Sequence, residues 1–318
     1  VHVKNSIILS EYLQCDLLSH VSEIPFYMNK SYDAIICAYA SPYMKYDAYM
    51  SVLLNNPSAK LFWFINDHDV EDNILLRKWS HLTRNQYDVI CNNPRDGYRG
   101  WILRKKSDDR TMDGWIRDWY TANLNVLIFD EESYKISNVD KSGCIYYGTF
   151  RKNRIKDMAD YNGLEYDLST SVKNHVKFKN GGIVANYIDK LDWQYQSKSQ
   201  LFFDKHLKDY KYSLYFEDVH THDNYAYMAN RFYEGVMHNV LMLYDYRCEQ
   251  TLIKSGYNIA PEQIVRNSRE TSEMIAKLDA NEEEYQRLLS IQQSNVQKIL
   301  LEREEILGYI RDSICGAF

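Results

Sequence analysis

Long apolar stretches are missing from this sequence. No run approaches the roughly 18 consecutive apolar residues that a membrane-spanning helix needs. The first residues, VHVKNSIILSEYLQ, lack the layout of a signal peptide. We therefore expect a soluble protein that stays in the cytoplasm.

Glycine, proline and paired cysteines are also scarce. The 318 residues include 12 Gly and 5 Pro, and the six cysteines are scattered, with no C-x-x-C pair and no histidine at zinc-ligand spacing. This composition excludes collagen, low-complexity disorder and small disulfide scaffolds. A chain of this length is long enough for two domains, each with a core of its own.

Positive charge is in deficit as well. The formal net charge is -6 at pH 7, from 38 Lys and Arg against 44 Asp and Glu. A protein that coats nucleic acid through its overall positive charge is thereby excluded. Any contact with nucleic acid must depend on a local patch of cations.

What the sequence does contain is an alternation of short apolar runs with amphipathic segments. Runs of strand length, rich in β-branched and aromatic residues, predict buried strands in the first half of the chain. Between them, apolar residues three and four apart predict helices over segments such as 46–54 and 71–79. This alternation predicts an α/β fold with a parallel sheet and helices on its faces. The predicted strands are residues 33–39, 60–65, 87–91 and 125–129.

The polar segment 130–142 (DEESYKISNVDKS) has no apolar period and is the predicted linker. It separates a first domain, residues 1–142, from a second α/β domain, residues 143–300. A helical pattern from residue 280 to 315 predicts one or two long helices, so residues 301–318 form a C-terminal helix. Within the second domain we predict a helix at 155–161 and strands at 144–147, 212–216 and 240–244.

Acidic residues follow the strand 60–65 directly, in Asn66-Asp67-His68-Asp69. An acid at the carboxyl end of a buried strand lies where ligands bind, and partial burial can make it a general base. Alternatively, Asp69 or Asn66 caps a helix that begins near Val70. Asp-His-Asp also matches an Asp-x-Asp pattern that can hold a divalent metal on a nucleotide diphosphate, which makes Asp69 a candidate metal ligand.

The strand 144–147 ends in a turn, Gly148 to Arg154, that carries two arginines. A small residue in the turn lets backbone N–H groups approach a ligand. Arg151 and Arg154 are three residues apart, so both guanidiniums can point at one diphosphate near a helix N-terminus. A surface helix with ordinary cations is the alternative.

A second arginine motif, Arg231 to Glu234, precedes the strand 240–244. Residues three apart share a helix face, so Arg231 could meet a phosphate while the Glu234 carboxylate accepts both hydroxyls of a ribose. The alternative is a plain intrahelical ion pair.

These motifs together resemble the DNA β-glucosyltransferases of T-even bacteriophages, which have the two-domain GT-B glycosyltransferase fold. Residues 145–151 (IYYGTFR) are similar to the family's strand followed by Gly-Ser-Phe-Arg. Residues 223–234 are similar to its Asp-Asn-Phe, spacer and Arg-Val-Trp-Glu. The likeness continues through 241–245 and 289–293, and 63–67 resembles the family's strand ending in Thr-Asp.

The resemblance implies two Rossmann-like domains that face each other across a cleft. Residues 1–142 would take the DNA acceptor, residues 143–300 the UDP-sugar, and residues 301–318 would pack back toward the first domain. Asp67 would be the catalytic base of an inverting transfer of glucose, or of a pentose such as arabinose. The implied donor contacts are Gly148, Thr149, Arg151, Arg154, Arg231 and Glu234.

The implied acceptor is a 5-hydroxymethylpyrimidine, above all 5-hydroxymethylcytosine, in duplex DNA, and reaching its hydroxyl requires base flipping. Segment 95–119 interleaves cations with Tyr and Trp, as such an acceptor needs, although it also fits a tryptophan-anchored surface loop diluted by aspartates. A phage protein of this kind would be a monomer in the host cytoplasm that protects phage DNA, with Mg²⁺ or Mn²⁺ as candidate metals. The DNA-binding candidates are Arg95, Arg99, Trp101, Arg104, Lys105 and Lys106.

Three other functions stay open from the residues. The fold and donor site could serve a saccharide, lipid or protein acceptor. The chain could be a GT-B relic that binds nucleotide or DNA without catalysis. It could also be a metal-dependent enzyme that uses Asp67 and Asp69 as ligands.

Overall fold

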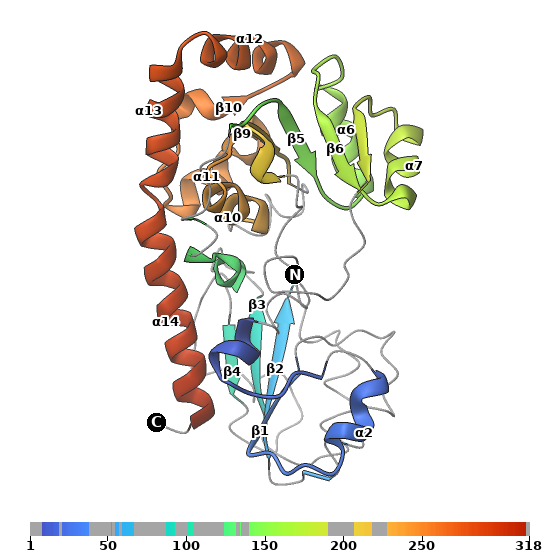
Figure 1. Cartoon of the computed structure of the whole chain (residues 1–318), viewed down its shortest axis with the longest axis vertical. Coiled ribbons are helices and arrows are strands. Elements are labelled where there is room, and N and C mark those ends of the chain that lie inside the picture. The colour runs from blue at the N-terminus through green and yellow to red at the C-terminus, as the bar shows by residue number, and fades with distance from the viewer. Residues whose placement is uncertain are drawn as a thin grey trace. The chain divides into compact units, whose positions relative to one another are not determined.

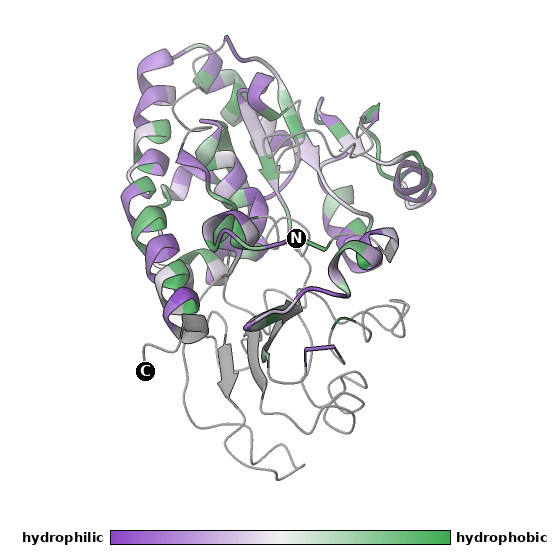
Figure 2. Cartoon of the chain, turned by 60° about the horizontal axis from the view of Figure 1, so that its bottom comes forward, coloured by the Kyte–Doolittle hydropathy of each residue, from purple (hydrophilic) through white to green (hydrophobic). Residues whose placement is uncertain are grey.

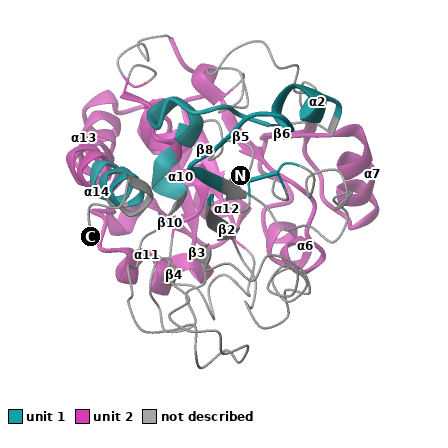
Figure 3. Ribbon diagram, turned by 90° about the horizontal axis from the view of Figure 1, so that it is seen from below, with its two compact units in different colours: residues 1–127, 304–318 teal, residues 128–303 magenta. Residues whose placement is uncertain are grey.

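The chain divides into two compact units, which are described separately (Figures 1 and 3). The first comprises residues 1–127 and 304–318, and the second residues 128–303. The computed structural model describes residues 8–18, 21–37, 52, 55–56, 59–66, 87–92, 101–104, 124–131, 134, 140–189, 207–217 and 228–315.

The first unit contains a sheet with the order β1-β2-β3-β4. Strands β1 to β3 are parallel, as the sequence predicts, and β4 pairs antiparallel with β3. Strand β4 was not predicted. The strands are β1 (Ala34–Cys37), β2 (Lys60–Asn66), β3 (Tyr87–Asn92) and β4 (Trp101–Arg104), and the described helices before them are η1 (Val21–Glu23) and α2 (Ile24–Tyr27).

The second unit contains a parallel sheet of six described strands in the order β10-β9-β8-β5-β6-β7. Counted along the chain from β5, this order is 6-5-4-1-2-3, the doubly wound order of a Rossmann-type domain. The predicted parallel α/β architecture is confirmed for this unit. The strands are β5 (Cys144–Tyr147), β6 (Asp167–Thr170), β7 (Asn186–Asp189), β8 (Tyr212–Tyr215), β9 (Leu241–Asp245) and β10 (Ile264–Val265).

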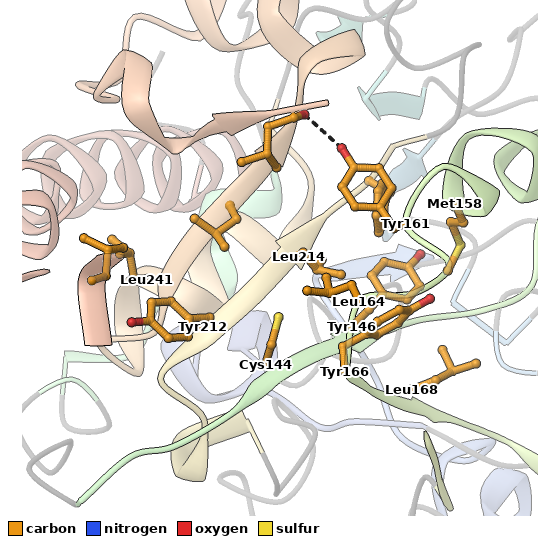
Figure 4. Packing of buried hydrophobic residues seen from close by; sticks show 14 of the residues in the cluster. Cys144, Tyr146, Met158, Tyr161, Leu164, Tyr166, Leu168, Tyr212, Leu214 and Leu241 are labelled. Atoms are coloured by element: carbon orange, nitrogen blue, oxygen red, sulfur yellow. Dashed lines mark hydrogen bonds between the residues drawn. The ribbon is translucent and has the colours of Figure 1, made fainter. Parts of the chain in front are cut away.

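Helices cover both faces of this sheet. On one face, alternate strand residues such as Tyr146, Leu214 and Leu243 join a buried apolar cluster with residues of α6, α7, α12 and α13 (Figure 4). On the other face, Ile145 and Val240 pack in a smaller cluster. Because both faces are buried, the central strands are continuous apolar runs, which is why the sequence shows them clearly.

Helix α10 packs closely on β9 because it carries a glycine at the contact. A Cβ at Gly235 would lie 2.2 Å from Sδ of the buried Met242. This close approach fixes the position of α10, which carries Arg231 and Glu234.

Side-chain caps start several helices of the second unit. Oγ of Ser171 accepts from the N–H of Asn174 at the start of α7, and Asn267 and Asn281 cap α12 and α13 in the same way. By contrast, α6 and α10 begin without a side-chain cap. The helices are α6 (Lys152–Ala159), α7 (Val172–Asn180), η5 (Leu207–Asp209), α10 (Asn230–Met237), η6 (Tyr246–Cys248), α11 (Glu249–Ser255), η7 (Pro261–Gln263), α12 (Ser268–Asp279), α13 (Glu282–Gln293) and α14 (Val296–Cys315).

The predicted C-terminal helical region is confirmed as α13 and α14. Hydrophilic and hydrophobic residues alternate along both helices (Figure 2). In α14 the buried residues Ile299, Leu307 and Ile310 recur at helical spacing, whereas Leu301 is exposed. Residues 296–303 of α14 belong to the second unit and residues 304–315 to the first.

The predicted strand at 125–129 is wrong. Residues Leu124–Ile128 form a 3-10 helix, η4, and the run from Val126 to Phe129 is fully buried. A short apolar run is compatible with either a buried strand or a buried helical turn, because it has no polar positions to reveal a period. The predicted helix 71–79 lies outside the described residues, as does 46–54 apart from Val52.

Lys141 offers a test of the segment that leads into β5. Its ammonium donates to the backbone carbonyl of His238, after α10, and burial lowers the pKa of Lys141 to about 8 although Asp209 opposes this. As the pH rises, an ammonium with a depressed pKa loses its proton at a lower pH in the folded state than in the unfolded state. Raising the pH from 7 to 10 therefore stabilises the fold through this group.

We expect the free energy of unfolding of the wild type, relative to Lys141→Met, to rise by about 1 kcal/mol between pH 7 and pH 10 in urea denaturation. This is less than the full shift because the side chain is partly exposed. A difference between the two proteins that stays constant with pH would contradict the depressed pKa.

Candidate functional site

Strands β5 and β8 lie side by side at the centre of the second unit's sheet, and the chain leaves them in opposite directions. It continues from β5 to β6 on one side and from β8 to β9 on the other. In a doubly wound sheet this reversal is the topological switch point, where ligands bind beyond the carboxyl ends of the strands. Gly148 follows β5 at this point, and Glu217 comes two residues after β8.

Gly148 permits a close approach of side chains to the turn. A Cβ at this position would lie 3.1 Å from Nη1 of Arg231 and 3.2 Å from the hydroxyl of Tyr146. The hydroxyl of Thr170 donates to the Gly148 carbonyl at 2.7 Å, and the Gly148 N–H donates to the carbonyl of Ser169 at 3.2 Å. The turn is therefore held to β6, while Thr149 is exposed.

Arg154, on the first turn of α6, is buried with 5% of its surface exposed, so the surface-cation alternative is wrong for this residue. Its Nη1 donates to the hydroxyl of Tyr146 at 2.6 Å, and its Nη2 lies 3.4 Å from Oε2 of Glu217. Arg151 is the N-cap residue of α6 and is exposed. The structure thus brings Arg154 into the site and leaves Arg151 at its edge.

Arg231, on the first turn of α10, reaches the same place from the opposite face. Its Nη2 is ion-paired with Oε1 of Glu217 and donates to the carbonyl of Phe216 at 2.8 Å. Its Nη1 lies 3.4 Å from the Tyr147 carbonyl, and the guanidinium lies 5.4 Å from the centre of the Tyr146 ring.

The charge on Arg231 is stabilised by these neighbours. Burial by itself disfavours the charged form. The Glu217 carboxylate outweighs it, together with the hydroxyls of nearby tyrosines, so the pKa of Arg231 lies above its ordinary value. The Arg231 guanidinium is therefore permanently charged at a largely buried position.

Glu234 is buried, with 3% of its surface exposed, one turn along α10 from Arg231. The hydroxyl of Tyr147 donates to its Oε2 at 2.8 Å. Tyr147 thereby fixes the Glu234 carboxylate next to the arginine pair. The ion-pair partner of Arg231 is Glu217.

Glu217 was not predicted from the sequence. It is buried and bridges Arg154 and Arg231, one carboxylate oxygen to each. The signal was present, because Glu217 follows the predicted strand 212–216 directly, as Asp67 follows the strand 60–65.

On each arginine the Nε–H group has no hydrogen-bond partner within the described part of the chain. Nε of Arg154 and Nε of Arg231 are buried and make no hydrogen bond with any described residue. An unmet buried donor costs on the order of 1–3 kcal/mol, and a ligand anion that accepts from it would remove that cost. Because α6 and α10 also lack side-chain caps, this corner of the sheet offers cations and backbone donors to an anion.

The predicted residues of the first unit lie largely outside the described residues. This applies to Asp67, Asp69, Arg95 and Arg99, and to Lys105 and Lys106. Trp101 and Arg104 are the first and last residues of β4, of which the backbone is described. Their proposed roles remain predictions from the sequence.

Within the described part of the chain, no three His, Cys, Asp or Glu side chains gather as a metal site would require. None of its helices combines the length and apolar character that crossing a bilayer demands.

The second unit is an α/β domain of the Rossmann type with an arginine-lined switch point, and the whole chain is similar in fold to a phage β-glucosyltransferase. Solved structures similar to this chain include those of T4 phage β-glucosyltransferase. Its complex with UDP-glucose has a TM-score of 0.59 and 15% identity, covering 98% of this chain and 93% of that one. Its complex with UDP and Mn²⁺ has a TM-score of 0.58, with the same identity and coverage.

A third structure, of the DNA modifying enzyme β-glucosyltransferase with and without uridine diphosphoglucose, has a TM-score of 0.56 and 15% identity, covering 98% and 92% of the two chains. No protein-family model and no curated protein sequence matches this chain. The resemblance predicted from the motifs is thus confirmed, and at this identity it establishes the fold.

Proposed function

We propose that the protein is an inverting glycosyltransferase that moves a sugar from a UDP-sugar to the hydroxyl of a 5-hydroxymethylpyrimidine in duplex DNA. The observation that carries the proposal is the arginine pair at the switch point, the buried Arg154 and the largely buried Arg231, with Glu234 on the same helix as Arg231. The fold likeness to a protein solved with UDP and UDP-glucose supports the choice of donor.

In the donor site, Arg154 and Arg231 would bind the diphosphate and stabilise the charge that builds on the departing UDP. Glu234 would accept the hydroxyls of the uridine ribose, held in place by Tyr147. Gly148 and Thr149 would lie against the phosphates, and Arg151 would act from the exposed edge of the turn.

The chemical step is a direct displacement. The Asp67 carboxylate would take the proton of the acceptor hydroxyl while its oxygen bonds to the anomeric carbon. The bond from that carbon to the UDP oxygen breaks with its electron pair, so the sugar inverts and UDP leaves as an anion. Asp69 is the candidate ligand for Mg²⁺ or Mn²⁺, and it lies outside the described residues.

The acceptor part of the proposal rests on the sequence. Residues 1–142 would form the DNA domain of a two-domain GT-B arrangement, with residues 143–300 as the donor domain and 301–318 returning to the first. Cations and aromatic residues in 95–119 would bind phosphates and stack on the extruded base.

Nucleoside mass spectrometry tests donor and acceptor together. The protein is incubated with duplex DNA carrying hydroxymethylcytosine or hydroxymethyluracil and a panel of UDP-sugars. A mass gain of one sugar on the modified base is expected, with unmodified DNA as the control. UDP release with a saccharide, lipid or protein acceptor, and none with DNA, would overturn the DNA acceptor and retain the donor site.

Glu234→Gln tests the ribose contact. Loss of the charged acceptor should weaken UDP binding by about 10–100-fold, the effect of losing hydrogen bonds to a charged group. The affinity for inorganic pyrophosphate should not fall, because pyrophosphate has no ribose and the substitution removes a negative charge. Isothermal titration calorimetry measures both, with Glu249→Gln, an exposed glutamate of α11, as the control. Equal losses for the two ligands would refute the assignment.

A further inference from the structure

Glu217 binds the two guanidiniums that a diphosphate would need. Its Oε2 lies 3.4 Å from Nη2 of Arg154, and its Oε1 is ion-paired with Nη2 of Arg231. The same carboxylate is 94% buried, so water screens these contacts little.

The contacts along each guanidinium show which N–H groups Glu217 leaves available for an anion. An oxyanion binds bidentately to one edge of a guanidinium, and one such edge is formed by Nε and Nη2. On both Arg154 and Arg231, Nη2 contacts Glu217, and on Arg231 it also donates to the Phe216 carbonyl. The adjacent Nε of each arginine is buried and has no partner among the described residues. Glu217 therefore occupies half of the anion-binding edge on each arginine.

We propose that Glu217 is an internal competitor for the diphosphate: the ligand must displace its carboxylate from Arg154 and Arg231, and the carboxylate returns when the product leaves. This inference rests on the proposed donor site. It assigns Glu217 a positioning and specificity role that weakens the binding of both UDP-sugar and UDP. Because product release limits many transferases, such weakening would favour turnover.

Charge arithmetic gives the direction of the effect. The two arginines contribute two positive charges, and Glu217 cancels one of them. Replacing Glu217 by Gln keeps the shape and removes a negative charge a few ångströms from the phosphates. At the effective dielectric constant of a partly buried site, this strengthens anion binding by at least roughly tenfold.

The test is the affinity of Glu217→Gln for inorganic pyrophosphate and UDP, measured by calorimetry beside the wild type. We expect both ligands to bind at least about tenfold more tightly and to raise the melting temperature of the variant more than that of the wild type. The KM for UDP-sugar should fall and product inhibition by UDP should increase. Glu284→Gln is the matched control, since Glu284 also contacts two cations, Arg287 and Lys277, but on the exposed surface of α13.

Unchanged or weaker pyrophosphate binding by a folded Glu217→Gln overturns the inference, because Glu217 would then only hold the arginines in place. Binding by neither protein overturns it as well. If pyrophosphate binding tightens but UDP binds no better than pyrophosphate, the inference stands and the nucleotide donor fails. If the wild type binds UDP more tightly than pyrophosphate, but Glu217→Gln binds neither ligand more tightly than the wild type, the UDP-sugar donor is supported and the inference is overturned.

A measurement on the wild type removes the dependence on the variant's folding. In NMR spectra of arginine-labelled protein, the Nε–H signals of Arg154 and Arg231 should shift together as pyrophosphate is added, since both Nε groups gain a partner. They are assigned with Arg154→Lys and Arg231→Lys. A titration in which neither signal moves, or only one, overturns the proposal.

Discussion

Asp67→Asn is expected to lower the rate of sugar transfer to hydroxymethylated DNA by about 10²–10⁴-fold, the range for loss of a general base. Asparagine keeps the size and polarity of the side chain but cannot accept the proton of the acceptor hydroxyl. The affinity for UDP should stay within about twofold of the wild type, because the proposed donor contacts all lie in residues 148–234. Nucleoside mass spectrometry over time gives the rate, and calorimetry gives the affinity.

The neighbouring Asp69→Asn separates the base from the alternatives for this segment. If Asp69 caps a helix, its loss costs about 1 kcal/mol of stability and leaves the rate intact. If both aspartates hold a metal, both variants lose activity and chelation abolishes donor binding. A wild-type rate in Asp67→Asn would remove this residue from the chemistry, whatever the outcome for Asp69.

The second unit was predictable because its central strands are buried on both faces. Continuous apolar runs such as 144–147 and 240–244 mark such strands, and the polar residues after them mark the edge where ligands bind. The run 125–129 is equally apolar but forms a 3-10 turn, since composition records burial and not backbone conformation. Strand β4 was missed because its four residues lie among charges that suggested a loop.

The residues of the candidate site were likewise predictable from the sequence only in part. Arg154, Arg231 and Glu234 were found because they stand in motifs at helical spacing. Their partners are Tyr146 and Tyr147 of β5 and Glu217 beyond β8. The sequence does not show which of these side chains contact which, so the pairing became visible only in the fold. The sequence also could not tell that Arg151 is exposed and Arg154 buried, because three-residue spacing alone does not fix which side faces the sheet.

Arg231→Lys is expected to lower kcat/KM for UDP-sugar by about 10²–10³-fold, the effect of removing one preorganised group that stabilises a developing charge. Lysine keeps the positive charge, so Glu217 remains paired. A single ammonium cannot, however, bind Glu217, the carbonyls of Phe216 and Tyr147 and a phosphate in the fixed directions of a guanidinium. Steady-state kinetics with the DNA acceptor in excess measures the effect, and denaturation should show a loss of about 1–3 kcal/mol.

The control for this substitution is Arg287→Lys. Arg287 also holds two carboxylates through Nε and Nη2, those of Glu284 and Glu262, but it is exposed on α13. Exposed ion pairs contribute little, so neither stability nor turnover should change measurably. If Arg231→Lys were as active as Arg287→Lys, the buried guanidinium would serve the fold alone. The diphosphate would then have to depend on Arg154 and the turn at Gly148.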